Sequence, residues 1–158
     1  MTADKNTPND TDREIVITRL IDAPRERVFE AWSEPARLTR WFAPHPYTLP
    51  LCEMDFRPGG RFRMAMRAPE GVEHPFTGVY REIVPPSRLV WTGEFPYGPV
   101  DQIRTTVTFE EEGKKTKLTV RQTFSALTPE TEPHTRGAKQ GWTATLDQLQ
   151  ALAESDER

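Results

Sequence analysis

Six strand-like segments follow one another between residues 47 and 124, and they constrain the fold more than any other feature. Each is a short run rich in β-branched and aromatic residues, and turns containing Gly or Pro separate several of them. The segment RFRMAMR alternates apolar with mostly basic residues, which gives a strand one apolar and one wet face. Short connections favour antiparallel pairing, so we expect one antiparallel sheet. The expected strands span 47–56, 61–67, 75–84, 88–95, 101–112 and 116–124.

A further strand and two short helices are expected before this sheet region. Residues 14–21 have high β propensity. The apolar residues that follow are spaced one helical turn apart, which predicts helices within 22–32 and 34–42. Asp22 and Ser33 are the expected N-caps of these two helices.

Helical periodicity returns from about residue 135 to 153, with Trp142 expected near the start of the helix. Its apolar stripe consists of Trp142, Leu146, Leu149 and Leu152. One strand, two short helices, a meander of strands and a long helix make an α+β arrangement, in which the last helix packs on one face of a curved sheet.

Composition limits the number of domains and the location of the chain. The 158 residues, 35% of them hydrophobic, suit a single domain over 13–154. Residues 1–12 are polar and are expected to form a disordered tail, and 155–158 a polar end. The first residues lack the apolar centre of a secretion signal, which favours the cytoplasm. The single cysteine, Cys52, suits a reducing compartment; we expect a buried filler, with a reactive thiol as the alternative.

Charge and hydropathy exclude two classes of partner. The formal net charge of −3 provides no basic surface for nucleic acid or for an anionic membrane. No apolar run reaches the ~18 residues that a membrane-spanning helix needs. The open edge strands of such a sheet would permit a homodimer as well as a monomer.

Four motifs in unbroken order resemble the helix-grip START-like (SRPBCC) superfamily, in the branch named after the activator of the heat shock protein 90 ATPase. The motifs are APRERVFEAWSEPARLTRWF, DFRPGGRFRM, FTGVYREIVPPSRLVWT and GWTATLDQLQALAE. The resemblance covers about residues 14–153. It implies a seven-stranded sheet that wraps around the C-terminal helix, with the two short helices closing one end over a hydrophobic cavity.

A cavity of this kind would be lined by side chains of the apolar sheet face, the short helices and the last helix. Apolar pockets with few polar groups bind small lipidic or aromatic molecules, and methionines let the lining adapt to the shape of the ligand. The same residue types are also ordinary core packing. The candidate ligand-binding residues are Trp41, Phe62, Met64, Met66, Phe76, Tyr80, Trp91, Val107, Trp142 and Leu146.

Few residues suggest catalysis. His45 and His74 lie in expected loops near the cavity mouth, and Glu53 lies two residues from Asp55 on one side of a strand; these are the possible polar groups of the cavity. Exposed loop histidines and solvated carboxylates explain the same pattern. The three histidines are far apart in sequence and Cys52 has no companion thiol, so we predict no metal site and no cofactor.

Three functions remain open from the sequence. The first is the binding of a small hydrophobic or aromatic molecule in the cavity. The second is an enzyme acting on an aromatic or polyketide-like substrate, which the resemblance implies because relatives include cyclases and hydrolase-like proteins. The third is a co-chaperone that stimulates a heat shock protein 90 ATPase. The chaperone activators resembled here carry a further N-terminal domain, which the twelve polar residues are not expected to replace.

Overall fold

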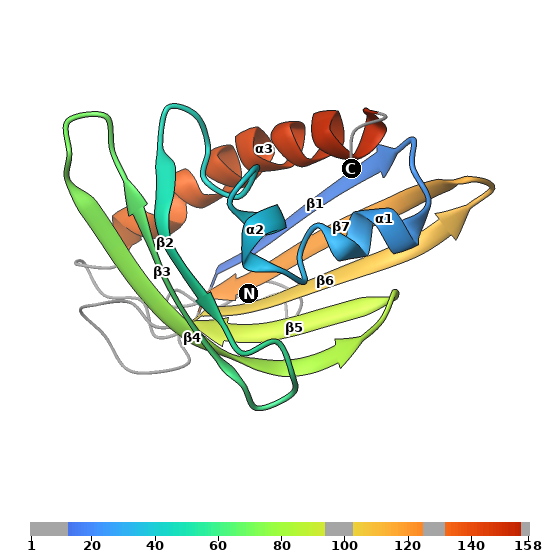
Figure 1. Cartoon of the computed structure of the whole chain (residues 1–158), viewed down its shortest axis with the longest axis horizontal. Coiled ribbons are helices and arrows are strands. Elements are labelled where there is room, and N and C mark those ends of the chain that lie inside the picture. The colour runs from blue at the N-terminus through green and yellow to red at the C-terminus, as the bar shows by residue number, and fades with distance from the viewer. Residues whose placement is uncertain (1–12, 94–102, 125–131, 156–158) are drawn as a thin grey trace, which may run out of the picture.

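A curved seven-stranded antiparallel sheet and three helices form the structure, a computed structural model that describes residues 13–93, 103–124 and 132–155. The elements, in chain order, are β1 (Arg13–Ile21), α1 (Arg25–Glu30), α2 (Pro35–Leu38), β2 (Thr48–Met54), β3 (Arg61–Arg67), β4 (Glu73–Val84), β5 (Arg88–Gly93), β6 (Ile103–Glu112), β7 (Lys115–Phe124) and α3 (Glu132–Glu154). Figure 1 shows the sheet bending around the space in which α1 and α2 lie, with α3 running alongside β1. The predicted α+β helix-grip fold is confirmed.

The sheet is a meander from β2 to β7, to which β1 adds next to β7. The strand order is β1-β7-β6-β5-β4-β3-β2, and every pair is antiparallel. Short turns between consecutive strands make this meander possible. At the turn before β3, a Cβ on Gly60 would lie 1.9 Å from the backbone oxygen of Asp55, so only glycine fits. Gly113 takes a positive φ of 63° in the turn between β6 and β7.

The long helix α3 packs its apolar stripe against α1 and against β1, the edge strand that pairs with β7. Leu146 and Leu149 are completely buried and Ala153 is 4% exposed. Burying each leucine stabilises the fold by about 1.5–3 kcal/mol. An ion pair of 2.6 Å between Arg19 of β1 and Asp147 of α3 holds the helix along the strand. The apolar stripe of α3 is therefore part of the hydrophobic core.

The structure corrects three details of the helix predictions. Trp142 lies in the middle of α3, because the helix already begins at Glu132. Asp22 does not cap α1, since that helix begins at Arg25 and its N-cap is Pro24. The α2 N-cap is Glu34, and the Ser33 hydroxyl instead donates to the carbonyl of Glu30 at 2.9 Å. In each case apolar spacing indicated the helix but not its first residue.

Some predicted segments fall outside the described residues. These are the tail over 1–12, the ends of the predicted strands at 94–95 and 101–102, and the last three residues of the chain. Within the described part, no helix is long and apolar enough to cross a membrane.

Candidate ligand-binding cavity

A small apolar cavity lies between the α1–α2 region and the central strands of the sheet. Its volume is about 30 Å³. The lining residues come from the segment after α1, from α2 and the turn after it, and from β3, β4 and β5. They are Trp32, Leu38, Phe42, Phe62, Met64, Phe76, Tyr80, Leu89 and Trp91. We expected the cavity between the sheet and the C-terminal helix, but no residue of α3 whose side chain the structure describes is among them.

The sheet wall of the cavity follows from strand alternation. Phe62 and Met64 of β3 point to the buried face, as do Phe76 and Tyr80 of β4. Gly78 lies between the last two and pairs with Phe62 across the strands. A Cβ at Gly78 would lie 2.3 Å from the Phe62 ring, so the glycine lets this ring lie against β4. The ring thus forms part of the cavity wall instead of being displaced from it.

The opposite wall is carried by the chain between α1 and β2. Trp32 follows α1, Leu38 ends α2, and Phe42 lies in the turn after α2. Trp41, between the last two, is completely buried, and its indole N–H donates to the carbonyl of Ala31 at 3.0 Å. We call residues 31–45 the cover segment, because its side chains close the cavity on the side away from the sheet.

One glutamine of α3 holds the cover segment in place. The side-chain amide N–H of Gln148 donates to the carbonyls of Trp41 at 2.8 Å and Ala43 at 2.9 Å. Its side-chain oxygen accepts the backbone N–H of His45 at 2.7 Å. Thr145, one turn earlier, donates its hydroxyl to the Phe42 carbonyl at 3.2 Å. The long helix therefore positions the cavity wall through hydrogen bonds, although its described residues do not line the cavity.

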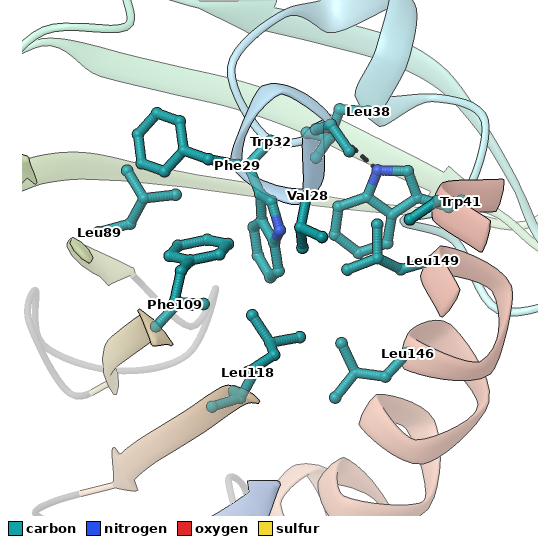
Figure 2. Close-up of a cluster of buried hydrophobic side chains, with 14 of the residues drawn as sticks. Val28, Phe29, Trp32, Leu38, Trp41, Leu89, Phe109, Leu118, Leu146 and Leu149 are labelled. Atoms are coloured by element: carbon teal, nitrogen blue, oxygen red, sulfur yellow. Dashed lines mark hydrogen bonds between the residues drawn. The ribbon is translucent and has the colours of Figure 1, made fainter. Parts of the chain in front are cut away.

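Four tryptophans and several phenylalanines form one aromatic cluster around the cavity, part of which appears in Figure 2. The ring of Trp32 is at its centre. It meets Trp41 edge-to-face at 4.6 Å and Trp91 in a tilted contact at 5.9 Å, and it stacks with Trp142 at 6.2 Å between ring centroids. Such pairs stabilise the fold beyond their burial by about 0.5–1.5 kcal/mol each.

The indole N–H groups of this cluster differ in their hydrogen bonding. That of Trp41 has the acceptor described above, drawn as a dashed line in Figure 2. That of Trp142 donates to the side-chain oxygen of Gln122 at 3.1 Å, and Gln122 in turn donates to the Thr105 hydroxyl at 2.9 Å. The buried N–H of Trp32 has no hydrogen-bond partner among the described residues.

The cavity comes closest to the molecular surface at three of its aromatic residues. Phe42, Phe76 and Trp91 are the lining residues that keep an intermediate exposure, whereas the other six are buried. The rings of Phe42 and Phe76 are 6.4 Å apart, one from the cover segment and one from β4. Both rings are therefore partly accessible to solvent.

Burial keeps the two titratable groups on this side of the sheet neutral. It raises the pKa of the Tyr80 hydroxyl well above its usual range, and the nearby Cys52 raises it further. Burial also raises the pKa of the Cys52 thiol to about 11. Neither group is an anion near neutral pH, so Cys52 lacks the thiolate that a nucleophile requires.

Five of the ten predicted ligand-binding residues line the cavity, namely Phe62, Met64, Phe76, Tyr80 and Trp91. Trp41, Val107 and Leu146 are instead completely buried in the core. Met66 and Trp142 are partly buried and pack against that core without lining the cavity. The sequence reasoning missed four lining residues: Trp32, Leu38, Phe42 and Leu89. The first three belong to the apolar spacing that predicts the two short helices.

None of the predicted polar candidates lines the cavity. Glu53 is exposed and forms an ion pair of 3.1 Å with Arg63. His45 and His74 are also exposed. Glu53 points away from the cavity because odd-numbered positions at this end of β2 are on the solvent face. In the residues that the structure describes, no three His, Cys, Asp or Glu side chains come together as a metal site would require.

The comparisons with known proteins agree with this architecture. A family model described as "Activator of Hsp90 ATPase homolog 1-like protein" matches residues 22–154. The chain belongs to this family. The resemblance to START-like (SRPBCC) domains is therefore confirmed. No curated protein matches the chain significantly.

Solved structures of bacterial proteins share the whole fold. The protein CV1439 from Chromobacterium violaceum is 32% identical with a TM-score of 0.78, and the match covers 91% of this chain and 99% of that one. A protein from Rhizobium leguminosarum is 33% identical with a TM-score of 0.76, over 90% and 95% of the two chains. The AHSA1-like protein from Aeromonas hydrophila is 26% identical with a TM-score of 0.71, over 92% and 98%.

Proposed function

We propose that this domain binds a small, mainly aromatic molecule in the cavity between the cover segment and strands β3–β5. The observation that carries the proposal is the apolar cavity itself. Protein interiors leave few voids larger than a water molecule, and ligand sites are concave and mostly apolar. Membership of a START-like family supports the same function.

The volume implies that the cavity widens when a ligand enters. About 30 Å³ accommodates one or two water molecules, whereas an engineered apolar cavity that binds benzene measures about 150 Å³. Two features of the lining permit widening. Met64 has three rotatable side-chain bonds, and Phe42 and Phe76 are only partly buried, so neither ring is enclosed on all sides.

Binding is favoured over catalysis because of the residues at the site. The described lining residues include no carboxylate, histidine, serine or thiol, and the phenol of Tyr80 stays protonated. General acid–base and nucleophilic mechanisms need a titratable or activated group within reach of the substrate. The predicted polar candidates are exposed elsewhere.

A cavity-filling variant tests the proposal. Purified protein is titrated with a panel of neutral bicyclic aromatics and fatty acids, and tryptophan fluorescence is recorded, because Trp32 and Trp91 line the cavity. Leu89→Phe adds volume at a lining residue that is 1% exposed and should weaken binding at least tenfold. Leu20→Phe makes the same change at a position that is 48% exposed and should leave the affinity unchanged.

Two results would contradict the proposal. One is a panel in which no member changes the fluorescence in a saturable way. The other is equal affinity in Leu89→Phe and wild type, with both proteins shown to be folded by circular dichroism. A ligand in the cavity would collide with the added phenylalanine ring, so its affinity should fall.

A further inference from the structure

The strand β3 continues the cavity wall toward solvent. Phe62, Met64 and Met66 share the inner face of this strand, because side chains alternate between its two faces. Phe62 and Met64 line the cavity and are 5% and 3% exposed. Met66 comes next on that face, but it is not among the described lining residues and is only partly buried. The inner face of β3 therefore changes from enclosed to partly open.

The neighbouring strand β4 shows the same change. On its inner face Tyr80 is 4% exposed, Phe76 is partly buried and His74 is exposed. His74 is the register partner of Met66, so the two strands become open at the same level of the sheet. The ring centroids of His74 and Tyr47 are 6.3 Å apart, and Tyr47 is 38% exposed. A polar, solvent-accessible end thus adjoins the apolar cavity.

Partly buried apolar side chains connect the cavity to this end. Phe42 and Phe76 line the cavity, and the ring of Phe42 lies 6.4 Å from Phe76 and 5.9 Å from Trp142 of α3. Met66 lies diagonally across from Phe76 in the β3–β4 register, within reach of a long side chain. We call Phe42, Met66, Phe76 and Trp142 the apolar strip.

The size of the cavity directs a ligand onto this strip. The cavity measures about 30 Å³, so even when widened to hold one ring it leaves the rest of a longer molecule outside. The apolar strip is the surface that continues from the cavity wall. Gly78, between two lining residues, is four positions from His74, which corresponds to about 13 Å along β4.

Exposure decides which part of such a ligand can be polar. Six of the nine lining residues are aromatic and none of the nine is charged, which favours an aromatic ring in the cavity. A carboxylate placed there would be buried without a counter-charge, which is costly. Beside the exposed His74 the same group would stay hydrated.

We propose that the ligand is an elongated amphipathic molecule. Its aromatic ring occupies the cavity, its apolar chain lies on the apolar strip, and a polar or ionised group at the far end reaches solvent beside His74. This inference rests on the proposed function, because it concerns the ligand of the same cavity.

Two alcohols test the role of the chain. Benzyl alcohol and 6-phenylhexan-1-ol have the same ring and hydroxyl group and differ only in the number of methylene groups between them. Burial of the added methylenes on the strip should make wild type bind 6-phenylhexan-1-ol at least about tenfold more tightly in the fluorescence titration. Equal affinities would refute the elongated ligand and leave the binding function intact.

The matching carboxylates test where the polar end lies. Benzoate should bind at least about tenfold more weakly than benzyl alcohol, because its charge lies at the cavity. The affinity of 6-phenylhexanoate should be within about fivefold of that of 6-phenylhexan-1-ol, because its charge lies in water. The same loss in both pairs would show that the far end is enclosed too and would refute the proposal.

Met66→Asp and Thr77→Asp are matched variants that each add one carboxylate. Met66 belongs to the strip, whereas Thr77 is next to Phe76 but on the opposite face of the sheet. Met66→Asp should reduce the advantage of 6-phenylhexan-1-ol over benzyl alcohol to less than about threefold, and Thr77→Asp should preserve it. An unchanged advantage in Met66→Asp would refute the proposal.

A measurement on wild type covers the case in which Met66→Asp does not fold. With ¹³C-methyl-labelled methionine, the ε-methyl resonance of Met66 should shift with 6-phenylhexan-1-ol and not with benzyl alcohol. Equal shifts with both alcohols, or none, would overturn the proposal. Failure of these probes to bind while another panel member binds would refute the elongated ligand alone, whereas failure of every compound would refute the binding function as well.

Discussion

Replacement of Gln148 should loosen the cover segment, because this one side chain forms three hydrogen bonds to it. The bonds measure 2.7, 2.8 and 2.9 Å, and Gln148 is partly buried. Each such bond contributes about 0.5–1.5 kcal/mol net, and water can replace some of them at the exposed end. We therefore expect Gln148→Ala to lower the free energy of unfolding by about 2–3 kcal/mol. For a domain of this size that corresponds to a fall in Tm of roughly 5–10 °C.

The isosteric variant Gln148→Glu separates the effect of lost hydrogen-bond donation from the effect of lost side-chain packing. A carboxylate keeps the shape of the side chain and can still accept the N–H of His45. It cannot donate to the carbonyls of Trp41 and Ala43, and it places negative charge against them. We expect Gln148→Glu to be at least as destabilising as Gln148→Ala at neutral pH.

Urea and thermal unfolding give the stability, and hydrogen exchange of the backbone N–H of His45 reports locally on the segment. Gln140→Ala, at an exposed position of the same helix, is the control and should change stability by less than about 0.5 kcal/mol. The reasoning would be refuted if Gln148→Glu were as stable as wild type, or if Gln148→Ala had no more effect than the control.

Two further predictions concern the polar groups near the cavity. Gln122→Ala should lower the free energy of unfolding, measured in urea, by about 2 kcal/mol. The substitution leaves the indole N–H of Trp142 without its acceptor and the buried Thr105 hydroxyl without its donor. A loss below about 0.5 kcal/mol would contradict this. Alkylation of Cys52 at pH 8 should be about a hundredfold slower in folded protein than in urea. Burial raises the pKa of the thiol from 9.0 to about 11, which lowers the fraction present as thiolate. Equal alkylation rates in the two conditions would contradict this prediction. The sign of this shift also predicts that the free energy of unfolding falls as pH rises from about 9 to 11.

Strand alternation made much of the fold predictable. The segment 61–67 alternates so regularly that its predicted bounds equal those of β3. The spacing of apolar residues likewise indicated all three helices. The N-caps were wrong because the first residue of a helix depends on local backbone geometry, which Asp22 and Ser33 do not determine alone.

The cavity was only partly predictable, because periodicity gives the face of an element and not the position of empty space along it. Val107 and Leu146 are on the correct faces but are completely buried, Val107 in β6 where α1 packs and Leu146 in α3 where it packs against β1 and α1. Trp32 and Phe42 belong to the apolar spacing that predicts the short helices, but their contact with β4 and β5 depends on how the cover segment crosses the sheet. Volume is harder still, because it is the small difference between the space enclosed and the side chains that fill it.

Methyl spectroscopy tests the central claim most directly, because one methionine lines the cavity. The chain has four methionines; Met64 is in the cavity wall, whereas Met54 packs against the core and is not among the described lining residues. With ¹³C-methyl-labelled methionine and a saturating neutral bicyclic aromatic from the panel, the ε-methyl group of Met64 should show stronger intermolecular nuclear Overhauser contacts to the aromatic protons of the ligand than that of Met54. Contacts to Met54 alone, or to neither residue while the ligand is bound, would place it outside this cavity and contradict the account.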